Sequence, residues 1–376
     1  RTLLLGFQFT ISMGLIIATG FILLQHNFML RQDMGFDRRN LMAVQLSSTA
    51  AMSYDALRDR LLADPRVVDV TGAEGRLISV DRMGWGRMYK GERISLQAYI
   101  VRWNFLKMMG IPIVEGRDFL ESDEHKEVGM LICNQAAQRE YGLVLNDVIG
   151  GFFGSDPLVG VCSDFNFRPM QYDVIPFVFY VVPEEWSQSS GGRASQLLYL
   201  RYRPEADVAD LANYLRQCIA EADPHLTPGD IQVRTFEDEL GAEYAKERRL
   251  ATVVGLFTVL SIVIALMGVF GIVLFETQYR RREVAIRKVM GATTTEVLRL
   301  FNRRYIILVI ISFVIATPIS LWIVDRWLSS FAYRVPIHWW VFAGAFLAVL
   351  LVTLGTVTFC SWRTANENPA NAVKSE

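Results

Sequence analysis

The charged side chains with the most regular spacing lie in one short segment of the chain, residues 280–292. Glu283 precedes Arg287 by four residues, which is the favourable order for an ion pair along a helix. An apolar patch on the same helix would consist of Ile286, Val289 and Met290. A basic helix with an apolar patch binds surfaces, so the chemistry that these residues support is docking, either to anionic lipid headgroups or to another protein.

Two residue patterns mark the end of this helix and the start of the next one. Gly291 supplies a natural stop, because glycine readily adopts the left-handed conformation that ends many helices. Thr293, with Glu296 three residues later, has the pattern of a capping box. The segment is therefore predicted to form a short helix followed by a longer one.

No pattern in the sequence supports catalysis or metal binding. The chain has no G-x-x-x-x-G-K-[ST] loop to hold a nucleotide phosphate, no G-x-S-x-G and no H-E-x-x-H. Its four cysteines include no C-x-x-C pair and its four histidines are scattered, so buried free thiols are expected instead of a metal site. Asp118 and Asp164 each stand beside a phenylalanine, in strand-to-turn settings where single acids usually have structural roles. The sequence predicts no enzyme, no cofactor and no metal.

Long apolar runs must position the basic segment. A helix needs roughly 20 apolar residues to cross about 30 Å of hydrocarbon. Four segments reach that length: residues 3–24, 250–275, 305–324 and 339–361. None of the four runs has a charged residue in its middle, so none predicts an ion pathway. The third run contains Pro318, which a membrane helix tolerates with a kink. Tryptophans suited to the headgroup zone stand at the ends of the last two runs: Trp322, Trp327, Trp339, Trp340 and Trp362.

Charge placement predicts the orientation of these spans. A soluble protein with four such uncharged runs would be unusual, and the loop 276–304 carries a large excess of arginine. By the positive-inside bias this loop is predicted to be cytoplasmic, and so are both termini of the chain. The region 26–249 between the first two spans is then extracytoplasmic, since long domains are translocated largely regardless of charge.

The region 26–249 has the pattern of a mixed α+β domain. Strands are predicted at residues 41–46, 67–71, 94–101, 130–133, 158–162, 176–182, 197–202 and 231–235. Helices are predicted at residues 53–63, 134–141 and 208–222. The serine- and glycine-rich residues 186–193 are expected to form a mobile loop.

Helical extensions are predicted at both ends of this domain. Phe236, Leu240 and Tyr244 recur every four residues just before the second span. This stripe fits a helix that extends out of the membrane and, with residues 26–34 extending the first span, forms a stalk. Periodicity alone fits an amphipathic helix lying on the domain equally well.

The segment R-E-V-A-I-R-K-V-M-G-A, residues 282–292, resembles the coupling segment of MacB/FtsX-like ABC transporter permeases, R-x-x-E-I-G-I-R-K-A-L-G-A. Ala285 stands where the family usually has glycine, and Met290 stands where leucine is common. The resemblance extends over nearly the whole chain. Residues 106–111 and 115–119 resemble the family's "lgi…GRdF" segment, residues 159–165 its "VvGVv.DF" segment, and residues 368–373 a weaker version of its tail.

The resemblance implies a membrane α-helical fold with four spans and an inserted extracytoplasmic α+β domain of the MacB periplasmic core type. It divides the chain into span one (1–25), the outer domain with its stalk helices (26–249) and an FtsX-like domain (250–376) with spans two to four and the coupling loop. It places the chain in the bacterial inner membrane, with the large domain in the periplasm. The chain most resembles the C-terminal half of a long Bacteroidota permease, and its start at Arg1 agrees with a fragment.

The resemblance also implies partners. In this family the coupling segment engages a separate ATP-binding subunit, so ATP is bound by that subunit and no cofactor by this chain. The implied docking residues are Arg282, Glu283, Ile286, Arg287, Lys288, Val289, Met290, Gly291 and Ala292. The resemblance further implies a second four-span half, which belongs either to the same longer chain or to a second copy in a homodimer. Membrane lipid and a periplasmic adaptor or outer-membrane channel are also implied partners, and nucleic acid is not.

The expected function is mechanotransmission, in which ATP hydrolysis by the partner moves the outer domain for efflux or substrate release. The resemblance leaves open a regulator of a cell-wall hydrolase. A membrane sensor or scaffold without a transport cycle is a third possibility. The transported or released substrate does not follow from the sequence.

Overall fold

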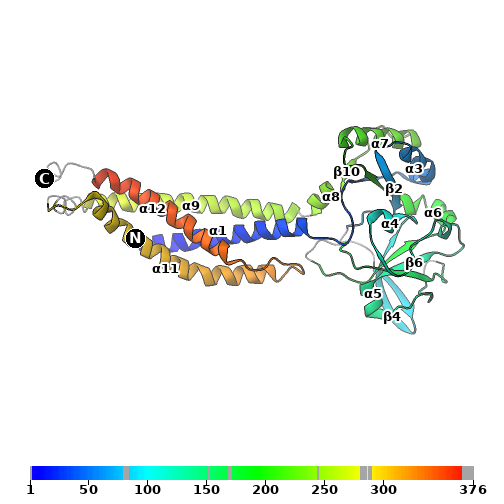
Figure 1. Cartoon of the computed structure of the whole chain (residues 1–376), viewed down its shortest axis with the longest axis horizontal. Helices are drawn as coiled ribbons and strands as arrows, with labels where there is room; N and C mark the ends of the chain where they lie inside the picture. Colours follow the sequence, from blue (N-terminus) through cyan, green and yellow to red (C-terminus); the bar gives the residue numbers. More distant parts are fainter. Residues whose placement is uncertain are drawn as a thin grey trace. The chain divides into compact units, whose positions relative to one another are not determined.

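The computed structural model describes residues 2–78, 84–150, 153–167, 172–243, 245–279, 286 and 290–365. The chain forms two compact units (Figure 1). One, the membrane unit, comprises Arg1–Arg31 and Ala245–Glu376, and the other, the outer unit, comprises Gln32–Tyr244. The chain therefore passes from one unit to the other twice.

The membrane unit contains four long helices: α1 (Thr2–Arg31), α9 (Ala245–Tyr279), α11 (Thr294–Leu328) and α12 (Trp339–Ala365). Each is long and apolar enough to cross a membrane, with candidate spans at Leu3–Arg31, Arg248–Glu276, Thr294–Leu328 and Trp339–Trp362. The predicted fold class, four membrane helices with an inserted α+β domain, is confirmed. The helices continue past the predicted apolar runs, because polar residues at their ends, such as Gln25 or Arg299, are compatible with helix.

The first helix is central to the membrane unit. Helix α1 contacts α9, α11 and α12. One ridge of its side chains is almost fully buried, and its members follow each other at intervals of four residues: Leu5, Phe9, Met13, Ile17 and Phe21. Residues spaced by four share one face of a helix, so this ridge packs into the other three helices.

The outer surface of the membrane unit is apolar. Large side chains on α9 and α11 are exposed, among them Leu256 at 67%, Met267 at 69% and Val314 at 64%. A patch of this kind would be unstable in water, but it suits contact with lipid. Four of the five predicted interface tryptophans, Trp322, Trp339, Trp340 and Trp362, are also at least half exposed. The structure thus supports a multi-pass membrane protein.

The outer unit contains two sheets. The first has the order β10-β1-β9-β2 and is antiparallel throughout. Its strands are β1 (Leu41–Gln45), β2 (Val67–Ala73), β9 (Leu197–Tyr202) and β10 (Val233–Thr235). Helices α2 (Ser48–Met52), α3 (Tyr54–Leu62) and α7 (Val208–Ala222) pack with this sheet around one core, and we call this part the four-stranded lobe.

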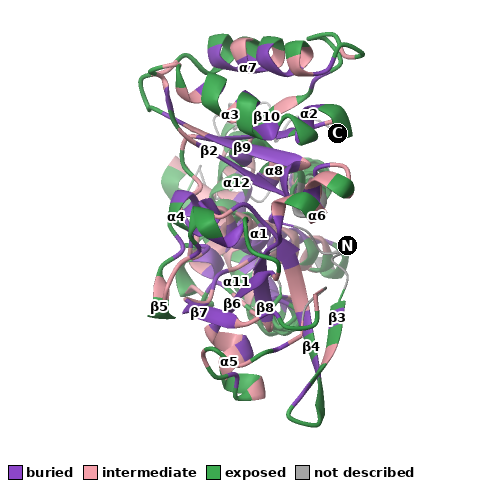
Figure 2. Ribbon diagram, turned by 90° about the vertical axis from the view of Figure 1, so that its right-hand side faces the viewer, coloured by how far each residue is buried: buried purple, intermediate pink, exposed green. Residues whose placement is uncertain are grey.

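The second sheet is mixed and has the order β3-β4-β8-β6-β7-β5. Its strands are β3 (Gly84–Tyr89), β4 (Glu92–Ile100), β5 (Ile113–Gly116), β6 (Met130–Asn134), β7 (Leu158–Cys162) and β8 (Phe177–Val181). The pairs β4–β8 and β6–β7 are parallel. With helix α5 (Gln135–Tyr141) it forms the six-stranded lobe, whose central strands are buried, while buried and exposed residues intermix along the β3–β4 hairpin (Figure 2).

The two lobes meet at an aromatic core. The end of β2 bridges to the chain just after β4, at Ala73 and Val101. Beside this bridge lie seven fully or almost fully buried rings, from Tyr99, Phe105, Phe165, Phe167, Phe177, Phe179 and Tyr199. Such edge-to-face and tilted ring contacts favour one packing arrangement over others. The short helix α4 (Phe105–Met109) brings Phe105 into this core.

All eight predicted strands and all three predicted helices of the outer unit are present. Two strands, β3 and β5, were not predicted. The expectation of a mobile loop at residues 186–193 is wrong for its first half, because α6 (Glu184–Ser189) occupies it and a 3-10 turn, η2 (Arg193–Ser195), ends it. The acidic residues Glu184 and Glu185 lie in the first turn of α6, where they interact favourably with the helix dipole.

The stripe at residues 236–244 belongs to the outer unit. Phe236 and Leu240 lie on helix α8 (Phe236–Glu243) and are 1% and 3% exposed. The Phe236 ring packs edge-on against Phe36, 5.6 Å between centroids. These contacts favour the amphipathic helix on the domain over a free stalk, while Tyr244 lies outside the described residues. Helix α1 does extend the first span, but it ends at Arg31.

Gly160 on β7 should be essential to the six-stranded lobe. A Cβ atom there would lie 2.3 Å from the carbonyl oxygen of Arg117, a backbone atom that cannot move aside easily. We expect Gly160→Ala to lower the free energy of unfolding of the outer unit by about 1–3 kcal/mol, as overpacked cores do. Thermal unfolding of the full chain would measure this. Gly75→Ala is the matched control, because a Cβ there meets no atom within 4 Å; equal midpoints for the two variants would refute the prediction.

Candidate functional site: the membrane bundle and its coupling segment

The described part of the coupling segment presents apolar side chains to solvent. Ile286 is 50% exposed and Met290 is 83% exposed. The backbone N–H of Met290 donates to the carbonyl of Ile286 over 3.0 Å, so the two residues are one helical turn apart. Gly291 follows with a φ of 95°, the left-handed conformation expected at a helix end. Gly291 is exposed and Ala292 is half-buried.

Five of the nine predicted docking residues lie outside the described residues: Arg282, Glu283, Arg287, Lys288 and Val289. The predicted capping box is confirmed. The Thr293 hydroxyl accepts from the N–H of Glu296 over 3.3 Å, and the Glu296 carboxylate accepts from the N–H of Thr293 over 2.9 Å. Two of the orphan N–H groups at the start of α11 are thereby satisfied.

The two helices that flank the coupling segment are tied together at its base. Glu276, near the end of α9, forms an ion pair with Arg304 of α11. The hydroxyl of Tyr305 donates to the same carboxylate over 3.2 Å. Tyr305 is 3% exposed, so it makes this contact from within the packed bundle. These contacts join the end of α9 to α11 on the side of the segment.

Hydroxyl groups join α1 to α9 within the span. The Oγ atoms of Ser12 and Ser261 are 2.7 Å apart, and the Oγ1 atoms of Thr19 and Thr258 are 2.8 Å apart. Thr258 also donates to the carbonyl of Leu15 over 3.2 Å. Hydrogen bonds between membrane helices are worth about 0.6 kcal/mol each on average. Together they favour movement of α1 and α9 as a pair.

Helix α1 is also bonded to α11 and to the connector that follows it. Ser312 of α11 donates to the carbonyl of Gly6 over 3.1 Å. Near the other end of α1, the side chain of Gln25 is fully buried. Its amide nitrogen donates to the carbonyl of Tyr333 and its oxygen accepts from the N–H of Val335, both over 2.8 Å. Gln25 thus fixes the connector between α11 and α12 to α1.

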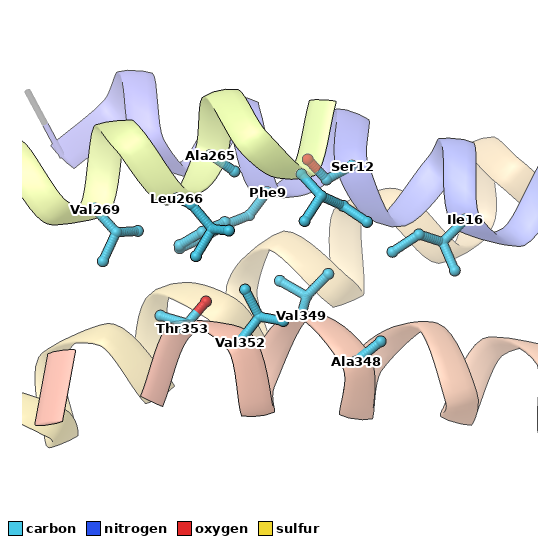
Figure 3. Close-up of a pocket in the computed structure, with 11 residues that line it drawn as sticks. Phe9, Ser12, Ile16, Ala265, Leu266, Val269, Ala348, Val349, Val352 and Thr353 are labelled. Carbon is cyan, nitrogen blue, oxygen red and sulfur yellow. The ribbon is translucent and has the colours of Figure 1, made fainter. Parts of the chain in front are cut away.

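A small cavity lies where α1 and α9 face α12 (Figure 3). Its volume is about 40 Å³. Apolar side chains such as Phe9, Val269 and Val349 form most of its wall, and Ser12 and Thr353 add hydroxyl groups. None of the hydrogen bonds found among the described side chains joins α9 to α12. The packing between these helices is therefore apolar and incomplete, in contrast to the α1–α9 contact.

The acids considered in the sequence have structural contacts. The Asp118 carboxylate accepts from the N–H of Phe119 over 2.8 Å. Asp164 accepts from the N–H of Ala136 over 2.7 Å and pairs with Arg139. All four cysteines are free and buried. Among the residues that the structure describes, no group of three or more His, Cys, Asp or Glu side chains is placed to hold a metal ion.

Sequence reasoning missed the contacts that hold the bundle. Glu276 and Arg304 entered the prediction only as charges that set orientation. Gln25 and the serine and threonine pairs entered only as neutral residues of a span. The signal in the sequence was the presence of polar residues in apolar runs, which need hydrogen-bond partners in lipid.

Comparison with known proteins gives one match to a family model. Residues 255–369 match the model of the FtsX-like permease C-terminal domain. This part of the chain, which includes most of α9 and all of α11 and α12, is similar to the C-terminal domain of FtsX-like permeases, as the sequence resemblance predicted. A search of curated proteins returned no match for this chain.

The solved structures that are similar to the chain include the following two. One is the periplasmic region of MacB from Actinobacillus actinomycetemcomitans, with 11% identity and a TM-score of 0.41 over 56% of this chain and 94% of that chain. The other is the extracellular domain of the noncanonic ABC-type transporter YknZ from Gram-positive bacteria. It has 12% identity and a TM-score of 0.38, over 52% of this chain and 98% of that chain.

Proposed function

We propose that the chain is the membrane subunit of an ABC-type transporter in which a separate ATP-binding subunit drives movement of the outer unit. The observation that carries this proposal is the match of residues 255–369 to the FtsX-like permease model, together with an exposed apolar pair, Ile286 and Met290, between α9 and α11. In our proposal the partner docks on residues 282–292. The segment lies in the cytoplasm, both termini lie on the same side, and the outer unit lies in the periplasm.

The bundle contacts support a path for the motion. Docking would act on the base of α9 and α11, which Glu276 and Arg304 join. Helix α1 follows α9 because of the hydroxyl pairs between them. Both α1 and α9 adjoin the two chain connections to the outer unit, after Arg31 and before Ala245. Ligand-driven switching requires a partner that binds one of two states more tightly, and ATP-dependent closure of the docked subunit would supply that difference.

The roles of the charged docking residues remain part of the proposal. Glu283 and Arg287 would form the helical ion pair, and Arg282 and Lys288 would contact acidic groups on the partner. The chain itself would bind no cofactor, and a second four-span half would complete the transporter. The substrate, an adaptor and an outer-membrane channel are further partners to be identified.

Affinity purification of the full-length protein from native membranes tests the proposal. Mass spectrometry is expected to find a P-loop ATPase that is lost from the Glu283→Ala, Arg287→Ala double variant. Recovery of an extracytoplasmic hydrolase with the ATPase would favour the hydrolase regulator. Recovery of no ATPase from either protein would reject the transporter and leave the sensor or scaffold.

A further inference from the structure

A pocket of about 790 Å³ lies in the outer unit beside α6. Its lining comes from three segments: residues 124–127, Phe153, and residues 183–186 with Gln188. The first segment follows the 3-10 turn η1 (Glu121–Asp123), and the last includes the first turn of α6. Pockets of about 300–1,000 Å³ are the size that binds drug-sized molecules. This pocket therefore has room for a small organic ligand.

Hydrogen bonds hold the three segments in place. The backbone N–H of Glu184 donates to the carbonyl of Glu124 over 2.8 Å, which joins the first segment to α6. The Asp156 carboxylate is fully buried, and it accepts from the N–H of Gly129 over 2.8 Å and from the N–H of Phe153 over 3.3 Å. The pocket is thus formed before any ligand binds, which lowers the entropy cost of binding.

Two aromatic rings form an apolar wall of the pocket. Trp186 of α6 and Phe153 are both half-buried, and their rings meet edge to face with 6.0 Å between centroids. Both rings pack against the core of the six-stranded lobe. Aromatic faces bind apolar groups, and they also attract cations that approach within about 6 Å. The wall suits a ligand that combines an apolar body with a positive charge.

The polar part of the pocket has an excess of negative charge. Its ionisable side chains are four glutamates, Lys126 and His125. Lys126 already pairs with the buried Asp123 over 2.7 Å. None of the ion pairs among the described residues includes Glu127 or Glu185, and both of these glutamates are exposed. Carboxylates that line a concave surface raise the local concentration of cations.

The other two glutamates of the pocket have partners of their own. Glu124 is 4% exposed and pairs with Arg102 over 3.0 Å. The carboxylate of Glu184 lies 3.3 Å from a ring nitrogen of His125. These two residues shape the pocket, and Glu127 and Glu185 remain to bind a ligand.

We propose that this pocket binds a small organic cation, in which an ammonium or guanidinium group is attached to an apolar body. Glu127 and Glu185 bind the charged group, and the body packs against Trp186 and Phe153. An organic cation fits better than a metal ion, because no group of three or more His, Cys, Asp or Glu side chains in the described part of the chain is placed to hold one. The site lies in the outer unit alone, so the proposal does not depend on an ATP-binding subunit.

A fluorescent amine can test the site. Dansylcadaverine combines a primary ammonium group with an apolar naphthalene ring, and its N-acetylated form has the same ring but no charge. With the full-length protein in an uncharged detergent, fluorescence anisotropy is expected to show saturable binding of dansylcadaverine. The acetylated probe should bind about tenfold more weakly, because it makes no ion pair with the two exposed glutamates.

Three variants separate the contributions of charge and of the aromatic wall. Glu127→Gln with Glu185→Gln should weaken binding of dansylcadaverine about tenfold and leave the acetylated probe unaffected. Trp186→Ala should weaken binding of both probes by about tenfold, because the apolar body loses its contact. The matched control is Glu92→Gln with Glu205→Gln, which removes two exposed charges elsewhere on the outer unit and should leave both affinities unchanged.

Equal affinity of the two probes for the parent protein would overturn the proposal, because the charge would then not be recognised. Unchanged binding of dansylcadaverine to the Glu127, Glu185 double variant, or no saturable binding to the parent protein, would overturn it as well. If Trp186→Ala does not fold, the double variant decides, since both of its positions are exposed. Binding of a lysine-rich peptide without binding of dansylcadaverine would reject the small cation and indicate a protein contact instead.

Discussion

Replacing Ile286 and Met290 together with aspartate is expected to weaken binding of the ATP-binding subunit by about 100-fold or more. The two side chains are 50% and 83% exposed and one turn apart. If a partner covers them, each contributes about 1.5–3 kcal/mol through burial, and about 1.4 kcal/mol corresponds to tenfold in affinity. Titration of the purified subunit against the detergent-solubilised permease would measure the change.

Leucine variants provide the control for this prediction. Ile286→Leu with Met290→Leu keeps the apolar surface and should bind the subunit with nearly unchanged affinity. Leucine is also common at the position of Met290 in the permease family whose coupling segment residues 282–292 resemble. If the aspartate variant bound the subunit normally but lost affinity for anionic vesicles, the segment would be a lipid anchor and the docking proposal would be wrong.

The fold of the outer unit could be predicted where a strand is buried. Strands β7 and β9 begin and end at the predicted residues, because short apolar runs bounded by polar or turn residues have few other solutions. Strand β3 was missed because it contains two glycines, which are uncommon in strands, and because exposed residues alternate with its buried ones. Strand β5 was missed because most of it is exposed. A strand whose stability comes from its neighbours leaves a weak pattern in its own sequence.

The contacts inside the membrane bundle could not be predicted for a different reason. A serine or threonine in a span can donate to its own helix, as Thr10 does to the carbonyl of Gly6 and Thr356 to that of Val352. Thr258 does this as well, but it also reaches Thr19 on α1. Residue type does not distinguish the two cases, because the outcome depends on how the helices are rotated against each other.

Gln25→Leu is expected to cause the largest loss of stability in the membrane unit. The substitution puts an apolar side chain of similar size into the fully buried position of Gln25. It leaves the carbonyl of Tyr333 and the N–H of Val335 without the bonds that Gln25 provides. An unsatisfied buried polar group costs about 1–3 kcal/mol, so the free energy of unfolding should fall by about 2–4 kcal/mol. Thermal unfolding in detergent would measure the loss.

Two further variants show whether the lost bonds are the cause. Gln25→Glu, neutral in this buried site, retains an acceptor for the N–H of Val335 and has a single O–H in place of the amide donor to Tyr333, so it should lie between the parent protein and the leucine variant. Thr356→Val removes a bond within α12 at a half-buried position and should change stability by less than about 0.5 kcal/mol. Equal stability of the Gln25→Leu and Thr356→Val proteins would contradict the prediction. Because Gln25 joins α1 to the connector before α12, the leucine variant should also release this connector, and faster hydrogen exchange at residues 329–338 would show it.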